Sequence, residues 1–230
     1  MDRPPALVAC SHGTNDPVGR QAIDQLRDAV SALRPELAVV EAYVDVQQPE
    51  LSEVLRDSGP AVVVPVLLSS GYHVHVDIAD AVAAAGPEVR MAAALGPDPA
   101  LVEVLVERLE AAMSGDSAVV LAAAGSSDRR AVKDVERTAS ELAGRLGRPV
   151  VPAYASAAEP RVDRAVAQLR SDGRRVVIAS YLLAHGFFYD QLGQADADIV
   201  TAPLLPHQAI AQVVLRRYRD IAESARPARS

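Results

Sequence analysis

An internal repeat constrains this chain more than any other feature of its sequence. The spacings between equivalent residues are nearly constant: 112 residues for Gly13 and Gly125, 111 for Pro49 and Pro160, and 109 for Pro97 and Pro206. Two unrelated domains would not keep the same order of turns and apolar runs. We therefore expect two tandem copies of one unit, over residues 1–115 and 116–230, joined at residues 114–117.

Within each copy, short apolar runs alternate with segments of helical periodicity. Residues 6–10 are typical of a strand buried on both faces, and residues 18–33 carry a single apolar stripe at helical spacing. The same criteria predict strands at 39–46, 61–68, 89–95, 118–123, 149–154 and 176–183, a short helix from Pro49 and a helix over 100–113. This order predicts an α/β fold of two tandem Rossmann-like or flavodoxin-like domains, each with a parallel sheet.

Composition argues against several classes of protein. Half of the residues are hydrophobic, but no apolar stretch reaches the ~18 residues of a transmembrane helix, and the N-terminus lacks the layout of a signal peptide. The single cysteine, Cys10, forms neither an internal disulfide nor a thiolate metal site. We therefore expect a cytoplasmic protein. The net charge of −7 and the absence of tryptophan argue against nucleic-acid binding.

The two copies differ in charge. Residues 1–115 contain 7 basic and 17 acidic residues, a net charge of −10, whereas residues 116–230 contain 16 basic and 13 acidic residues, a net charge of +3. An acidic first copy would attract a dication, and a basic second copy would suit an acidic substrate. The ordinary alternative is two differently solvated surfaces.

Polar residues cluster where the predicted strands end, which is the edge at which open α/β sheets bind ligands. His12, between Ser11 and Gly13, follows the first strand, Asp45 follows the second and His73 follows the third. Two imidazoles with a carboxylate suit an open site for a divalent first-row metal. Structural alternatives exist for each: a histidine often caps a helix or bonds to a carbonyl, and Asp45 would be stabilised by a helix N-terminus.

Three motifs give the chain a resemblance to a known family. They are Ser-His-Gly at residues 11–13, Tyr-Val-Asp at 43–45 followed by Gln-Pro at 48–49, and Ser-Gly-Tyr-His-Val at 70–74 followed by Asp-Ile at 77–78. Together they resemble the sirohydrochlorin chelatases, class II chelatases that insert Fe²⁺ or Co²⁺ into a tetrapyrrole. The resemblance spans nearly the whole chain, including the duplication of the longer members. It implies a chelatase-like fold with one active site in the cleft between the two domains.

The resemblance also implies roles for residues. His12 and His73 would bind the incoming metal and take protons from the macrocycle, and Asp45 would assist at a position where the family pattern carries Glu. The second copy has Ala124 and Phe188 where the first has these histidines, so the metal site would belong to the first copy. The substrate, sirohydrochlorin, carries eight carboxylates, and the residues expected to bind it are Ser69, Ser70, Gly71, Ser126, Ser127, Arg129, Arg130 and His185.

The divalent metal, Fe²⁺ or Co²⁺, would be a substrate, and we expect no organic cofactor, no nucleic-acid partner and no membrane partner. The protein would act as a monomer or a homodimer. Two other functions stay open. One is a non-catalytic carrier of metal or tetrapyrrole on the same scaffold. The other is a phosphoryl-transfer enzyme with His12 as nucleophile, although Ser11 stands where histidine phosphatases carry an arginine.

Overall fold

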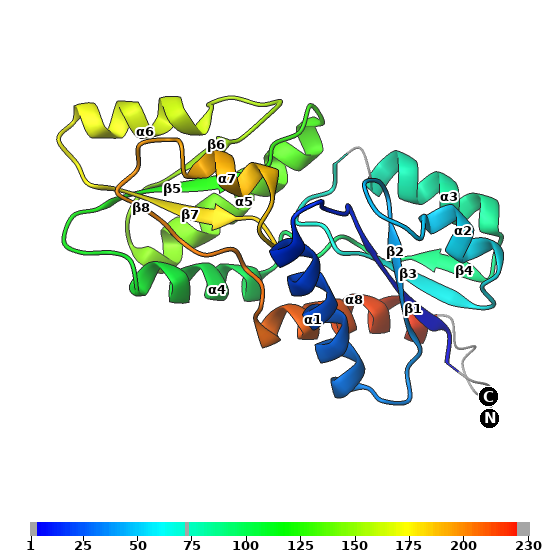
Figure 1. Cartoon of the computed structure of the whole chain (residues 1–230). Coiled ribbons are helices and arrows are strands. Elements are labelled where there is room, and N and C mark those ends of the chain that lie inside the picture. Colours follow the sequence, from blue (N-terminus) through cyan, green and yellow to red (C-terminus); the bar gives the residue numbers. More distant parts are fainter. Residues whose placement is uncertain (1–3, 72–73, 225–230) are drawn as a thin grey trace.

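The computed structural model describes residues 4–71 and 74–224 and contains two four-stranded parallel sheets (Figure 1). The first sheet has the order β2-β1-β3-β4, and the second repeats it as β6-β5-β7-β8. The strands are β1 (Ala6–Ser11), β2 (Val39–Tyr43), β3 (Ala61–Pro65), β4 (Val89–Met91), β5 (Ala118–Ala123), β6 (Val150–Tyr154), β7 (Val176–Tyr181) and β8 (Ile199–Val200). The prediction of two tandem α/β units with parallel sheets is confirmed.

Helices connect the strands in both copies. They are α1 (Pro17–Leu33), α2 (Leu51–Arg56), a π-helical turn η1 (Val74–Ile78), α3 (Ala79–Ala85), α4 (Pro99–Glu110), α5 (Arg129–Leu146), α6 (Val162–Ser171), α7 (Phe187–Leu192) and α8 (Gln208–Ser224). Several begin at side-chain caps, because Asp16, Asp98 and Asp128 accept hydrogen bonds from N–H groups of the first turn. Among the described residues, none of the helices combines the length and apolarity that crossing a membrane requires.

Four of the predicted strands are too long. The strands expected over 39–46, 61–68, 89–95 and 176–183 end at Tyr43, Pro65, Met91 and Tyr181. After β2 the chain turns sharply, since Val46 has a φ of 61°, which a strand does not accommodate. The residues beyond each strand belong instead to loops at the carboxyl edge of the sheet, where they are available to form a site.

Each sheet is covered on both faces, as an uninterrupted apolar strand requires. In β1, Leu7 and Ala9 belong to the largest apolar cluster, and Val8 and Cys10 belong to a separate cluster on the opposite face, with residues of α2 and β3. The largest cluster extends from β1 to β7 and α8, so the two sheets share one core. This shared core fixes the sheets relative to each other.

The last helix of each copy packs on the sheet of the other copy. Helix α4 leaves the first sheet and contacts α5 and β7, whereas α8 leaves the second sheet and contacts α1 and β3 (Figure 1). We call the unit formed by β1–β4, α1–α3 and α8 the first lobe, and the unit formed by β5–β8 and α4–α7 the second lobe. The two sequence copies, 1–115 and 116–230, therefore each contribute one helix to the other's lobe.

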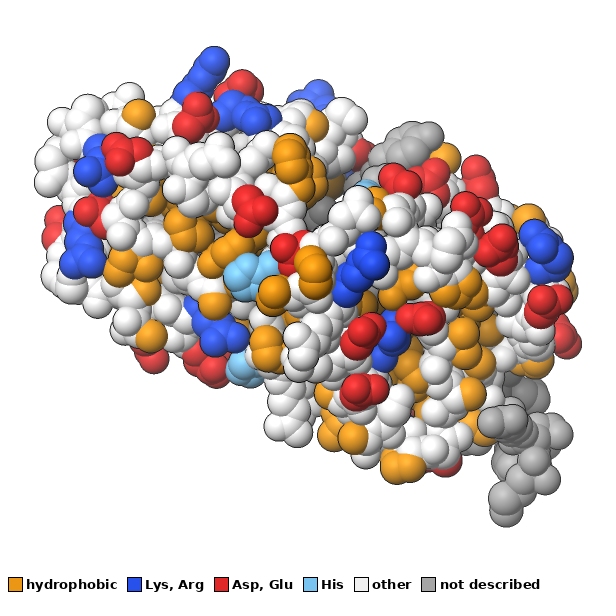
Figure 2. Space-filling model, in the orientation of Figure 1, with side chains coloured by type: hydrophobic (Ala, Val, Ile, Leu, Met, Phe, Trp, Pro, Cys, Tyr) orange, Lys and Arg blue, Asp and Glu red, His pale blue; other side chains and the backbone are white. Residues whose placement is uncertain are grey.

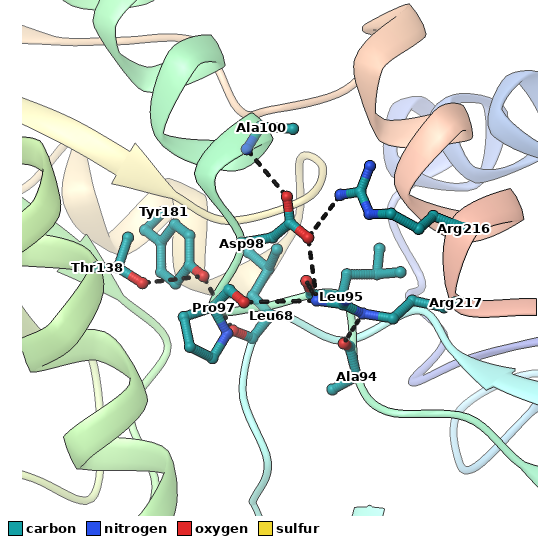
Figure 3. Close-up of polar contacts among 10 residues, drawn as sticks. All are labelled: Leu68, Ala94, Leu95, Pro97, Asp98, Ala100, Thr138, Tyr181, Arg216 and Arg217. Atoms are coloured by element: carbon teal, nitrogen blue, oxygen red, sulfur yellow. Dashed lines mark hydrogen bonds and ion pairs between the residues drawn. The ribbon is translucent and has the colours of Figure 1, made fainter. Parts of the chain in front are cut away.

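A buried carboxylate ties this exchange together (Figure 3). Asp98 is 5% exposed; one of its oxygens accepts from the Ala100 N–H at the start of α4, and the other accepts from Arg216 of α8 at 2.6 Å. Arg217 also pairs with Asp98, at 3.1 Å, and donates to the carbonyl oxygens of Ala94 and Leu95. A carboxylate with this many charge-assisted partners holds both crossing helices in place.

Candidate active site

A cleft of about 850 Å³ opens between the lobes, at the carboxyl edge of both sheets. Most of its lining comes from four loops that follow strands, two from each copy, with smaller contributions from the loops after β2 and β6. The lining includes residues 11–16 after β1, 66–69 and 71 after β3, 123–127 around the end of β5, and 181–189 after β7. The cleft therefore lies beyond the carboxyl ends of the strands, at the edge where open α/β sheets bind ligands, as the sequence predicted. The exchange of helices brings this edge of the first sheet and the same edge of the second sheet together around one space.

His12 is held in the cleft wall by its backbone. The residue before it, Ser11, is buried at the end of β1, and the carbonyl oxygen of His12 accepts from the Asp45 N–H at 3.1 Å. Gly13 has a φ of 96°, and a Cβ added there would overlap the Asp45 carbonyl oxygen. Because only glycine fits this turn, the chain presents the half-buried imidazole of His12 at a fixed point of the cleft.

The other two expected metal ligands are placed differently. Asp45 lies beside His12 through the backbone bond just described, but its exposed carboxylate accepts from the Val46 N–H at 2.7 Å and does not line the cleft. His73 lies outside the described residues. Within residues 4–71 and 74–224, no group of three or more His, Cys, Asp or Glu side chains is arranged to hold a metal ion.

The residues expected to bind substrate divide into two groups. Ser69, Gly71, Ser126, Ser127 and His185 line the cleft. Ser70, Arg129 and Arg130 do not. The exposed Arg130 forms a two-pronged pair with Asp128, which stands two residues before it at the start of α5. The roles assigned to all of these residues from the sequence stay predictions.

Aromatic residues form a part of the wall that sequence reasoning missed. Tyr154, Tyr181, Phe187, Phe188 and Tyr189 all line the cleft from the second copy. The phenol of Tyr181 is buried, which raises its pKa far above the ordinary value and keeps it neutral, and it donates to the Leu68 carbonyl oxygen at 3.0 Å. Sequence reasoning assigned Phe188 only as the residue equivalent to His73. The internal repeat could have pointed to these aromatic residues, because residues 187–189 occupy the positions equivalent to 72–74, among which His73 was expected in the site.

The two copies dock on each other reciprocally around the cleft. A Cβ at Gly71 of the β3 loop would lie 3.4 Å from Ser126 Oγ and 3.5 Å from Ala131 Cβ. In the equivalent contact of the β7 loop, a Cβ at Gly186 would lie 3.0 Å from Thr14 Oγ1, and a Cβ at Gly19 would overlap the His185 carbonyl oxygen. Thr14 and Gly19 are separated from Ser126 and Ala131 by the 112-residue repeat. Each strand-end loop is thus seated on the first helix region of the other copy.

The surface charge follows the sequence. On the face shown in Figure 2, acidic side chains predominate over the first lobe, whereas both signs occur over the second. The cleft lining is different from both surfaces, since none of the described residues that line it is a lysine or an arginine. Its ionisable members are Asp16, His12, His185 and the three tyrosines. The cleft is thus a largely neutral, aromatic space with one imidazole from each copy.

The fold is shared with solved chelatase structures. SirB from Bacillus subtilis, solved with Fe³⁺, is 21% identical with a TM-score of 0.80, over 96% of this chain and 97% of that chain. The sirohydrochlorin chelatase SirB from Bacillus subtilis subspecies spizizenii in complex with cobalt is 19% identical with a TM-score of 0.77 over the same shares. CbiX, described as the terminal enzyme for the biosynthesis of siroheme in denitrifying bacteria, is 21% identical with a TM-score of 0.69, over 98% and 100%.

A comparison with curated proteins found no match. A family model, by contrast, matches nearly the whole sequence. The CbiX model matches twice, at residues 6–112 and again at residues 118–221. The two matches correspond to the two copies of the repeat and leave out only the junction and the chain ends. The chain therefore belongs to the CbiX family, in which it carries two tandem copies of the family's domain.

Proposed function

We propose that this protein is a sirohydrochlorin chelatase, a lyase-type enzyme that inserts Fe²⁺ or Co²⁺ into the macrocycle. The observation that carries the proposal is the position of His12, fixed by the Gly13 turn in the wall of a cleft of about 850 Å³. Membership of the CbiX family supports it, as do the Fe³⁺ and the cobalt in the two SirB structures of the same fold.

Insertion requires that two pyrrole protons leave the macrocycle while a hydrated dication loses water and forms bonds to the ring nitrogens. A neutral imidazole serves both needs, as a metal ligand and as a proton acceptor near neutral pH. We assign these roles to His12 and His73, with Asp45 as a further ligand. The aromatic side chains of the cleft would pack against the faces of the macrocycle.

The buried, unpaired Cys10 agrees with a reducing compartment, and we place the protein in the cytoplasm, as a monomer or a homodimer. Iron and cobalt use nearly the same ligands. Competition between the two metals in one insertion assay, followed by the distinct absorption spectra of the products, would identify the preferred metal.

The test is an anaerobic assay with sirohydrochlorin and Fe²⁺ or Co²⁺, in which the absorbance change on metal insertion is followed. We expect His12→Ala and His73→Ala to abolish acceleration while the fold is retained. His207→Ala is the matched control, because His207 pairs with Glu107 at 3.0 Å and does not line the cleft. A wild-type protein that binds the tetrapyrrole without accelerating insertion would be a carrier. Full activity of the His12→Ala or the His73→Ala variant would remove that histidine from the mechanism.

A further inference from the structure

The proposed substrate brings eight carboxylates to a cleft whose described lining holds no lysine or arginine. Burying an ionised carboxylate without a partner is costly. The macrocycle would therefore sit with its rings against the aromatic wall of the second copy and its carboxylates at the rim. If the protein has the proposed function, a cationic residue at the rim must meet these carboxylates.

Arg20 is anchored to the cleft wall by its own guanidinium. It lies in the first turns of α1, and its Nε donates to the Thr14 carbonyl oxygen at 2.8 Å while Nη2 donates to Asn15 Oδ1 at 3.2 Å. Thr14 and Asn15 both line the cleft. Two neutral acceptors thus orient the guanidinium, and its other N–H groups, including both on Nη1, are available to a further acceptor.

No carboxylate of the protein neutralises Arg20 within the part of the chain that the structure describes. Two acidic residues lie four positions away in sequence. Asp16 caps α1 by accepting from the Gly19 N–H at 2.7 Å, and Asp24 pairs with Arg27 at 2.7 Å. The partners of Arg20 are neutral, so they orient the guanidinium without compensating its charge. Its positive charge is therefore available to attract an external anion.

Three other arginines of the described chain are already engaged. Arg130 is paired with both oxygens of Asp128, and Arg27 is paired with Asp24 and Glu41. Arg161 donates to the Ala155 carbonyl oxygen. Because Asp128 engages Arg130, the recognition of carboxylates that the sequence assigned to Arg130 is better supported, at the rim of the first lobe, by Arg20.

We propose that Arg20 binds a peripheral carboxylate of the tetrapyrrole and so sets how the macrocycle enters the cleft. A guanidinium suits this task, since it meets a carboxylate with two parallel hydrogen bonds. The residue contacts the edge of the substrate and not its nitrogens, so it contributes to binding and not to insertion.

The experiment compares Arg20→Gln with Arg56→Gln, which removes an exposed arginine of α2 that does not line the cleft. Binding of metal-free sirohydrochlorin is titrated directly, and the KM and kcat of insertion are measured at saturating metal. We expect Arg20→Gln to weaken tetrapyrrole binding and raise its KM by about five- to tenfold, with kcat within about twofold and the KM for metal unchanged. Arg20→Lys should recover part of the loss, because it restores the charge without the two-pronged geometry.

Unchanged tetrapyrrole affinity in Arg20→Gln, or an equal loss in Arg56→Gln, would overturn the proposal. The direct titration does not need turnover, so it separates the two claims: a wild-type protein that binds sirohydrochlorin through Arg20 but inserts no metal would contradict the proposed function alone. Raising the ionic strength should weaken binding to the wild type more than to Arg20→Gln, since screening acts on the lost ion pair.

Discussion

The backbone N–H of Ser70 donates to the carboxylate of Asp134 at 2.8 Å, across 64 residues and from one copy of the repeat to the other. Ser70 lies in the loop after β3, and Asp134 lies in the second turn of α5. The next residue of the loop, Gly71, packs against Ser126 and Ala131 at the start of the same helix region. The second copy thus holds a loop of the first copy that lines the cleft, although it supplies neither of the proposed catalytic histidines.

We predict that Asp134→Ala lowers the rate of metal insertion by about tenfold, because a hydrogen bond to a charged group is worth about 1.5–3 kcal/mol and the β3 loop would lose its anchor. Asp134→Asn keeps an acceptor oxygen at the same place and should retain most of the activity. The measurement is kcat for both variants, with the melting temperature as a check of folding. Equal rates for Asp134→Ala and the wild type would show that the bond does not position the loop.

Gly19 and Gly144 offer a matched pair for the contact on the other side of the cleft. A Cβ at Gly19 would overlap the backbone carbonyl of His185, whereas a Cβ at Gly144, within α5, meets nothing within 4 Å. We predict that Gly19→Ala destabilises the protein by about 1–3 kcal/mol and lowers its affinity for the tetrapyrrole, since the two copies must separate. Gly144→Ala should be neutral or stabilising by about 0.5–1 kcal/mol. Urea denaturation checks both, and equal free energies of unfolding for the two variants would contradict the contact.

Much of the fold follows from local patterns in the sequence. Apolar runs predicted every strand except β8, and parallel strands bring their carboxyl ends to one edge, so His12, Ser69 and Ser126 were correctly expected to face a common space. The exchange of α4 and α8 was not predictable in this way. An apolar stripe such as that of Leu101, Leu105 and Leu109 shows that a helix packs, but it does not show which of two similar sheets it covers.

The polar residues of the site show the same limit. Asp134 stands between Lys133 and Val135 on a charged helix and looks solvated in the sequence, because its partner is a backbone N–H 64 residues away. Arg130 looked available to a substrate, but Asp128 neutralises it. Sequence distance alone does not tell which charges are compensated, whereas hydrogen-bond partners in the folded chain do.

Cys10 provides a test of the core of the first sheet. Burial raises the pKa of its thiol to about 12, well above the ordinary value of about 8.5 in an unfolded chain. The protonated thiol is thus favoured in the folded state, so its contribution to stability is complete below about pH 8.5 and is lost as the pH rises toward 12. We predict that iodoacetamide fails to label the native protein at pH 8 but labels it rapidly in urea. Rapid labelling without denaturant would show that β1 is exposed.

The pair of Asp98 with Arg216 and Arg217 tests how the two lobes are joined (Figure 3). Removing one member of a buried ion pair costs about 3–5 kcal/mol, and the Asp98 side chain is 6% exposed while that of Arg216 is 40% exposed, so we expect the lower end of this range. Asp98→Ala also removes the cap of α4. We therefore predict a loss of about 3 kcal/mol in the free energy of unfolding, measured in urea, and a single transition in the wild type because the lobes share one core.

The control is Asp220→Ala, which removes an exposed carboxylate of α8 and should change the free energy of unfolding by less than about 0.5 kcal/mol. If Asp98→Ala loses no more stability than this control, the buried pair does not hold the exchanged helices.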